Sequence, residues 1–155
     1  MNDQEETIIL GKTGLANGSA TSEPKTTPTH QSVPSPAPPG LLYLALGDSY
    51  TFGEKVGTGE RFPGQLTQRL RAKGFEMRSP QILARTGWTT ADLSAEIAQA
   101  NPQGPFDLVT LLIGVNNQYR GLGLELYGRE FEGLVERAID LAGNDPGRVI
   151  VLSIP

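Results

Sequence analysis

Three short, almost continuous apolar runs constrain the fold of this chain more than any other feature of its sequence. They occupy residues 41–46, 107–113 and 149–152. Each has the length of a strand, and none alternates polar with apolar residues as a strand with one solvated face does. The runs therefore predict strands that are buried on both faces, which is typical of a parallel sheet covered by helices.

Helical patterns separate these runs. Pro63 is a favourable first helical residue, Leu66 and Leu70 lie one turn apart, and Gly74 marks the end of the helix. Residues 81–84 follow as a shorter predicted strand.

Two further helices complete the alternation. Residues 89–92 have the composition of a capping box, and Leu93 and Ile97 would lie on the buried face of the helix that it starts. A long helix is predicted over residues 125–142. Its apolar stripe consists of Phe131, Leu134, Val135, Ala138 and Leu141. The turn at 144–147 then leads into the last run. This βαβαβαβ order predicts an α/β fold of three layers, a parallel sheet between helices.

The first 40 residues differ from the rest. They hold six of the twelve prolines and none of the aromatic residues. Such a segment buries too little apolar surface to offset the entropy of ordering it. We therefore predict a disordered Ser/Thr/Pro-rich tail or linker over residues 1–40 and a folded domain over residues 41–155.

Composition excludes several classes of function. The chain has no cysteine, so disulfides and thiolate chemistry are excluded, and its net charge of −4 without a basic run argues against nucleic acid as a partner. No apolar stretch is long enough for a membrane span, and the N-terminus lacks the apolar core of a signal peptide. The chain as given is expected to be cytoplasmic. Export would require a start other than Met1.

Polar, glycine-containing motifs follow the first three predicted strands. They occupy residues 47–49, 85–88 and 114–117. Because the carboxyl ends of parallel strands lie along one edge of the sheet, the three motifs are expected to converge there. A serine that can attack, with a glycine N–H and an asparagine amide that can donate to an oxyanion, is a coherent set for acyl chemistry.

These motifs resemble the blocks of the SGNH hydrolases, the GDSL-type lipases and esterases. Gly-Asp-Ser-Tyr at 47–50 is similar to the first block, with Tyr50 where leucine is usual. Gly87 matches the second block, and residues 114–117 match the third, Gly-x-Asn-Asp, with Asn117 where aspartate is commoner. The resemblance implies a flavodoxin-like sheet in the order 2-1-3-4-5.

The resemblance also implies the chemistry. Ser49 would be the nucleophile, and the Ser49 N–H, the Gly87 N–H and the Asn116 side chain would form the oxyanion hole. The substrate would be a small-molecule ester, that is, a lipid, a thioester or an acetylated sugar. No cofactor and no metal would be needed.

One family block has no counterpart. The family supplies its general base from an Asp-x-x-His block near the end of the domain, whereas the only histidine here is His30, within the predicted tail. We therefore expect residues 41–155 to be the N-terminal part of the domain, with strands in the order 2-1-3-4 and the fifth strand missing. We also expect this chain to be inactive by itself.

Other interpretations remain open at this stage. Ser49 could be a turn serine, and Asp48 is expected to make a structural hydrogen bond. Asn116 and Asn117 could both be loop-stabilising asparagines, although the family position favours Asn116 for the oxyanion. Side chains near the motifs could line the substrate site or lie on the surface. They are Arg85, Trp88, Tyr119 and Arg120. The domain could be a ligand-binding module or pseudoenzyme of the same fold, or a flavodoxin-like phosphate or flavin module.

Overall fold

A single parallel sheet organises the part of the chain that the structure describes. The computed structural model describes residues 40–155, so the predicted tail over residues 1–40 lies, apart from Gly40, outside the described residues. The sheet consists of β1 (Tyr43–Gly47), β2 (Gln81–Ala84), β3 (Leu108–Leu112) and β4 (Val149–Val151). All neighbours pair in parallel, in the order β2-β1-β3-β4. The predicted strands and their order are confirmed.

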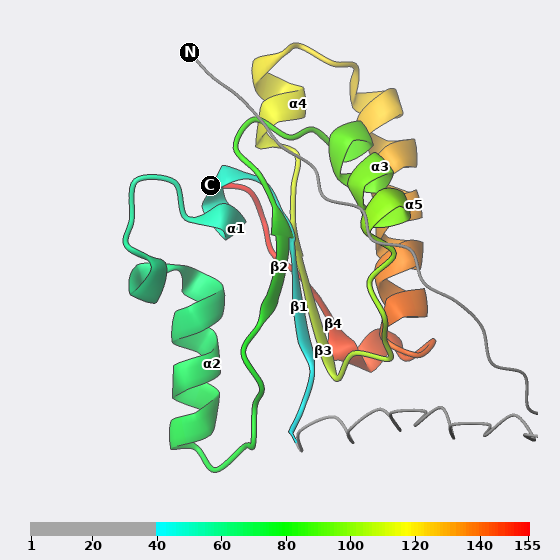
Figure 1. Cartoon of the computed structure of the whole chain (residues 1–155). Helices are drawn as coiled ribbons and strands as arrows, with labels where there is room; N and C mark the ends of the chain where they lie inside the picture. The colour runs from blue at the N-terminus through cyan, green and yellow to red at the C-terminus, as the bar shows by residue number, and fades with distance from the viewer. Residues whose placement is uncertain (1–39) are drawn as a thin grey trace, which may run out of the picture. The chain divides into compact units, whose positions relative to one another are not determined.

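Helices cover both faces of this sheet. Helix α2 (Phe62–Ala72) lies on one face, and α3 (Thr90–Ala100) and α5 (Leu124–Leu141) lie on the other (Figure 1). The larger core cluster lies between the sheet and α3 and α5, and it includes the whole predicted stripe of α5. Leu66 and Leu70 of α2 pack against a smaller cluster. The three-layer prediction is therefore confirmed.

Local signals place the helix starts where the sequence predicts them. Pro63 lies in the first turn of α2, and Thr89 caps α3. The Thr89 side chain accepts a hydrogen bond from the Asp92 N–H, while the Asp92 carboxylate accepts one from the Thr89 N–H at 2.9 Å. The predicted capping box is thus confirmed. None of the helices in residues 40–155 combines the length and apolarity that crossing a bilayer requires.

The shortest elements have no counterpart in the sequence-based prediction. The α-helices α1 (Ser49–Phe52) and α4 (Val115–Tyr119) follow β1 and β3 directly. Two 3₁₀ turns, at Thr58–Glu60 and Pro146–Arg148, lie in connections. Both short α-helices begin within the polar motifs, so they influence where the side chains of these motifs point.

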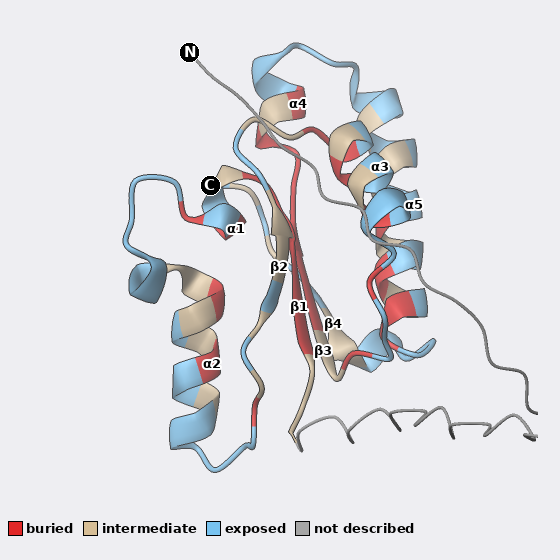
Figure 2. Ribbon diagram, viewed as in Figure 1, coloured by how far each residue is buried: buried red, intermediate tan, exposed pale blue. Residues whose placement is uncertain are grey.

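The last strand is less buried than its composition predicts. Ile150 and Val151 are 46% and 47% exposed, although residues 149–152 read as a strand buried on both faces. Figure 2 shows the contrast with β1, which is buried along its whole length. β4 is an edge strand with one neighbour, as the predicted strand order implies, so burial on both faces was wrong for these two side chains.

Gly47 is the point where β1 passes into the first motif, and no larger residue fits there. A Cβ at this position would overlap the Thr51 side chain of α1 and the backbone carbonyl oxygen of Leu112 in β3. The glycine therefore allows α1 to fold back against the strand end while β1 stays paired with β3.

We expect Gly47→Ala to lower the free energy of unfolding by about 1–3 kcal/mol, the usual range for overpacking a filled interior. Urea denaturation monitored by circular dichroism would measure the change. Gly133→Ala is the matched control, since a methyl group there meets open space on α5 and alanine favours helix by up to about 1 kcal/mol. An unchanged midpoint for Gly47→Ala would show that the close approach is wrong.

Candidate active site

Ser49 lies at the carboxyl end of β1, where it begins α1. Asp48 precedes it as the N-cap residue, and its Oδ1 accepts a hydrogen bond from the Tyr50 N–H at 3.0 Å. The short helix ends at Gly53, which has a left-handed φ of 74°. Ser49 is partly exposed while Asp48 is fully buried. The loop therefore presents the serine hydroxyl at the surface, and Asp48 makes the structural hydrogen bond predicted for it.

The Asp48 carboxyl group is buried and only one of its oxygens is hydrogen-bonded within the described residues. Its Oδ2 is buried and has no hydrogen-bond partner among the described residues, and the same is true of the Thr51 hydroxyl. Burial raises the pKa of Asp48 above its usual value, and the hydrogen bond from the Tyr50 N–H offsets part of that rise. Asp48 thus contributes to loop geometry at an energetic cost that an unconstrained turn would avoid.

The second and third motifs are in direct contact. Asn116, in α4, donates a hydrogen bond from Nδ2 to the carbonyl oxygen of Trp88 at 2.8 Å. Arg120, which ends the same helix, donates from Nη2 to the carbonyl oxygen of Gly87 at 2.7 Å. Gly87 has a φ of 83°, in the left-handed region that favours glycine. The turn that contains the predicted oxyanion donor is therefore attached to the helix that contains Asn116.

The neighbouring Asn117 has a different environment. It is 2% exposed, its Oδ1 accepts from the Thr90 N–H at 3.0 Å, and its Nδ2 donates to the Thr90 hydroxyl oxygen at 2.6 Å. The Thr90 hydroxyl is in turn hydrogen-bonded to the Glu130 carboxylate. Because that network already contains one carboxylate, an amide at 117 supplies the N–H that a carboxylate would lack.

Ser49 and Asn116 line the same cavity, of about 230 Å³. Its other walls include Tyr50, Glu54, Lys55 and Tyr119. The motifs gave no sign of Glu54 or Lys55, because both lie in the loop after α1 and Lys55 has a positive φ of 66° that no sequence pattern predicts. Of the four side chains that could have lined the site, only Tyr119 does so. In residues 40–155 no three histidine, cysteine or carboxylate side chains gather closely enough to hold a metal ion.

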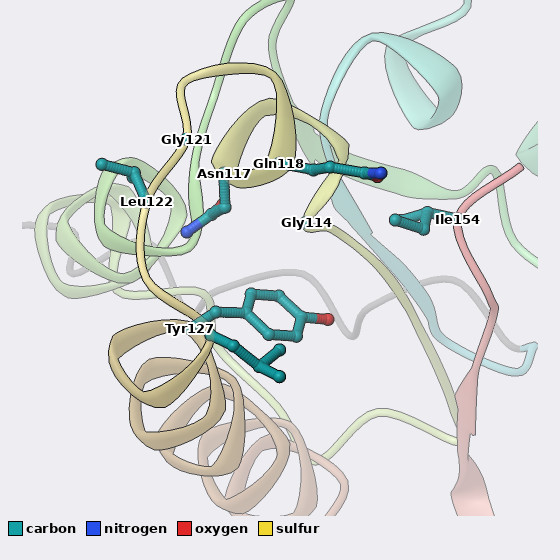
Figure 3. A pocket seen from close by; sticks show the side chains of 8 residues that line it. Gly114, Asn117, Gln118, Gly121, Leu122, Tyr127 and Ile154 are labelled. Atoms are coloured by element: carbon teal, nitrogen blue, oxygen red, sulfur yellow. The ribbon is translucent and has the colours of Figure 1, made fainter.

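A second cavity, of about 430 Å³, lies on the other side of α4. Figure 3 shows the Tyr127 side chain from α5 and the Ile154 side chain from beyond β4 bordering the space beside Gly114. Leu122 and Leu124 add apolar walls. Helix α4 thus separates a polar cavity that contains Ser49 from a larger and more apolar one.

We expect Asn117→Asp to destabilise the protein, although it restores the commoner residue of the third block. At neutral pH the new carboxylate would face the Thr90 oxygen and the Glu130 carboxylate without a proton to donate. The expected loss is about 1–3 kcal/mol.

The loss should shrink at low pH, where the introduced carboxyl is protonated and can donate again. Its pKa would be raised in the folded state, so the stability is lost as the pH rises through that value. Thermal melts at pH 4 and pH 7 would measure both effects. Gln118→Glu adds the same charge at an exposed neighbour and should leave the melt unchanged. Equal melts for Asn117→Asp and the parent chain would contradict this account of the network.

Known structures resemble the fold of this chain. The crystal structure of AlinE4, an esterase of the SGNH-hydrolase family, is 24% identical over 76% of this chain and 59% of its own, with a TM-score of 0.61. TesA is 20% identical over 72% of this chain and 58% of its own, also with a TM-score of 0.61. The psychrotrophic esterase EstA from Pseudoalteromonas sp. is 17% identical over 72% of this chain and 57% of its own, with a TM-score of 0.53.

These structures support the α/β fold, and the chain spans less than two thirds of the length of each of them. A search of curated proteins gave no match. The sequence model of the GDSL-like lipase/acylhydrolase family matches residues 45–155, which is most of the chain. The resemblance seen in the three motifs is thereby confirmed, and the chain belongs to the GDSL-like lipase/acylhydrolase family.

Proposed function

We propose that this chain carries the nucleophile and the oxyanion hole of a serine ester hydrolase. The observation that supports this most strongly is that Ser49 and Asn116 line one cavity while Asn116 is hydrogen-bonded to the Gly87–Trp88 turn. Ser49 and Asn116 thus come from two strand ends to one small space, and the turn after the third strand end, that of β2, is attached to Asn116, although Gly87 itself does not line the cavity. Two of the proteins with resembling structures, AlinE4 and EstA, are esterases, which is consistent with the same chemistry.

In the proposed reaction the Ser49 hydroxyl oxygen attacks the carbonyl carbon of an ester. The carbonyl oxygen becomes an oxyanion while a base takes the Ser49 proton. Collapse of the tetrahedral intermediate breaks the bond to the alcohol oxygen, which takes up that proton, and leaves an acyl group on Ser49. Water then releases the acid. Each donor to the oxyanion contributes about 10²–10³ in rate where it is correctly aimed.

The hydrogen-bonding capacity of the site fits this role. The Asn116 amide nitrogen has two protons, and the one donated to Trp88 leaves the other free to face the oxyanion. The Gly87 N–H is the second proposed donor. The Ser49 N–H, in the first turn of α1, is the third, since helix-terminal N–H groups lack intrahelical acceptors.

The proposed substrate is a small-molecule ester from one of three classes: a lipid, a thioester or an acetylated sugar. The larger apolar cavity beside Gly114 lies across α4 from Ser49, so it is not proposed as the site of the acyl group.

The general base is the missing part. Residues 40–155 contain no histidine, and His30 lies outside the described residues. Loss of the base from a serine triad lowers turnover by about a millionfold. We therefore propose that this chain alone turns over esters very slowly. The same observation favours a second candidate, a pseudoenzyme that binds an acyl or sugar ligand without turnover.

Labelling with an alkyl fluorophosphonate distinguishes these candidates. With imidazole added to replace the missing base, we expect one phosphonyl adduct on Ser49, detected by intact-mass and peptide mass spectrometry, because the probe reacts with an accessible, deprotonated nucleophile beside an oxyanion hole. Ser49→Ala should abolish the adduct, whereas Ser94→Ala, which removes an exposed hydroxyl on α3, should not. An unlabelled parent chain, or an adduct on another residue, would refute Ser49 as the nucleophile and favour the binding module.

Added imidazole should rescue turnover if only the base is missing. Hydrolysis of p-nitrophenyl acetate by the chain should increase with imidazole beyond the sum of the separate rates of imidazole and protein. The increase should grow as the pH rises through the imidazole pKa, about 6.5 for a histidine side chain, because the neutral form is the base. Ser49→Ala should show no increase. Rapid hydrolysis by the chain without imidazole would show that another residue supplies the base.

A further inference from the structure

Arg120 connects two parts of the candidate site that are distant in sequence. Its Nη2 donates to the Gly87 carbonyl oxygen at 2.7 Å, and its backbone N–H donates to the Asn116 carbonyl oxygen at 3.0 Å. One residue is therefore bonded both to the turn of the second motif and to the helix turn that carries Asn116. Its side chain is 55% exposed, so it lies at the surface of the site and outside the core.

The guanidinium also approaches the start of α3. Arg120 Nη1 lies 3.9 Å from Asp92 Oδ2, and the same carboxylate oxygen accepts from the Thr89 N–H at 2.9 Å and from the Thr89 hydroxyl at 2.8 Å. The two Thr89 hydrogen bonds and, to a smaller extent, Arg120 hold the pKa of Asp92 below its usual value. The ionised Asp92 carboxylate therefore attracts Nη1 of the Arg120 guanidinium, while Nη2 donates to the Gly87 carbonyl oxygen.

The Gly87 turn has few other restraints. Glycine moves between left- and right-handed backbone conformations more readily than other residues, so the φ of 83° at Gly87 depends on its surroundings. The turn is closed by the Trp88 N–H, which donates to the Arg85 carbonyl oxygen at 3.3 Å, the long end of the range for such bonds. The carbonyl oxygen of Gly87 accepts from Arg120, and the carbonyl oxygen of Trp88 accepts from Asn116.

We infer that Arg120 is a positioning residue that fixes the Gly87 turn so that its N–H faces the oxyanion. This inference rests on the proposed function, in which Gly87 is an oxyanion donor. Arg120 acts through the Gly87 carbonyl and not on the substrate. Neither Arg120 nor Gly87 lines the Ser49 cavity, so the turn would reach the oxyanion through the Gly87 backbone N–H alone.

The first test measures the turn itself in the uninhibited full chain. In Arg120→Ala, the ¹⁵N order parameters of the Gly87 and Trp88 amides should fall from about 0.85, typical of rigid backbone, to below about 0.6. Arg137→Ala is the matched control, because Arg137 is 44% exposed and forms a comparable ion pair with Asp140 at 3.9 Å, on α5. Unchanged order parameters at both amides would overturn the inference.

The second test measures the consequence for chemistry with the alkyl fluorophosphonate, at one fixed concentration of imidazole as the added base. At saturating probe, Arg120→Ala should label Ser49 about tenfold more slowly than the parent chain, a smaller loss than deletion of an oxyanion donor causes. The probe concentration that gives half-maximal rate should stay the same, because binding and transition-state effects separate in this way. Arg120→Lys should recover part of the rate, since it retains a charged donor.

The outcomes separate the two ideas. A raised half-maximal probe concentration with an unchanged maximal rate would mean that Arg120 contacts the probe, which overturns the positioning role. If the parent chain is not labelled at all, the proposed function fails, and the order parameters alone decide whether Arg120 holds the turn. If Arg120→Ala does not fold, Arg120→Gln takes its place with the same readouts.

Discussion

The parallel pairing of β1 with both of its neighbours is the constraint on which the candidate site depends. Gly47 pairs with Ala84 of β2 and with Leu112 of β3, so the three strands end at one level. The chain leaves each strand within two residues of that level and passes directly into a polar motif. Because adjacent strands are only about 4.8 Å apart, side chains in these loops are within hydrogen-bonding reach of one another. The register therefore places the three motifs at one edge of the sheet, and the contacts between the loops act on motifs that already lie side by side in the fold.

Side chains near the starts of the helices accept hydrogen bonds from backbone N–H groups in the segments that follow the strands. Asp48 accepts from the Tyr50 N–H, Asp92 accepts from the Thr89 N–H, and Asn117 accepts from the Thr90 N–H. Each bond also fixes the direction in which a short helix or turn leaves the sheet. An unpaired buried N–H costs free energy comparable to a lost hydrogen bond, so these residues stabilise the fold as well as the site.

The sequence predicted the long elements well and the details of the site poorly, for physical reasons. The run at 107–113 has the length and composition of a buried strand between turn signals, and the stripe of α5, which has 18 residues, has the period of a helix. Helices α1 and α4 have four and five residues, too few for any periodicity to be visible.

Local sequence patterns also could not predict the contacts that hold the site together, because these contacts join residues far apart in the chain. The bond from Asn116 to Trp88 joins residues 28 positions apart, and that from Arg120 to Gly87 joins residues 33 apart. From the sequence, Arg120 was therefore only a side chain near the motifs, which could either line the substrate site or lie on the surface.

The two adjacent asparagines show how a short helix resolves an ambiguity that the sequence leaves. Asn116 and Asn117 have the same chemistry, and either could be a site residue or a loop-stabilising one. Successive residues of an α-helix point about 100° apart, so α4 directs Asn116 to the Ser49 cavity and Asn117 to the buried Thr90. Asn117 uses both ends of its amide on Thr90, whereas Asn116 donates only one of its two amide protons to Trp88. The residue that retains an unused amide proton is the one that lines the cavity, and this supports the oxyanion role that we propose for Asn116.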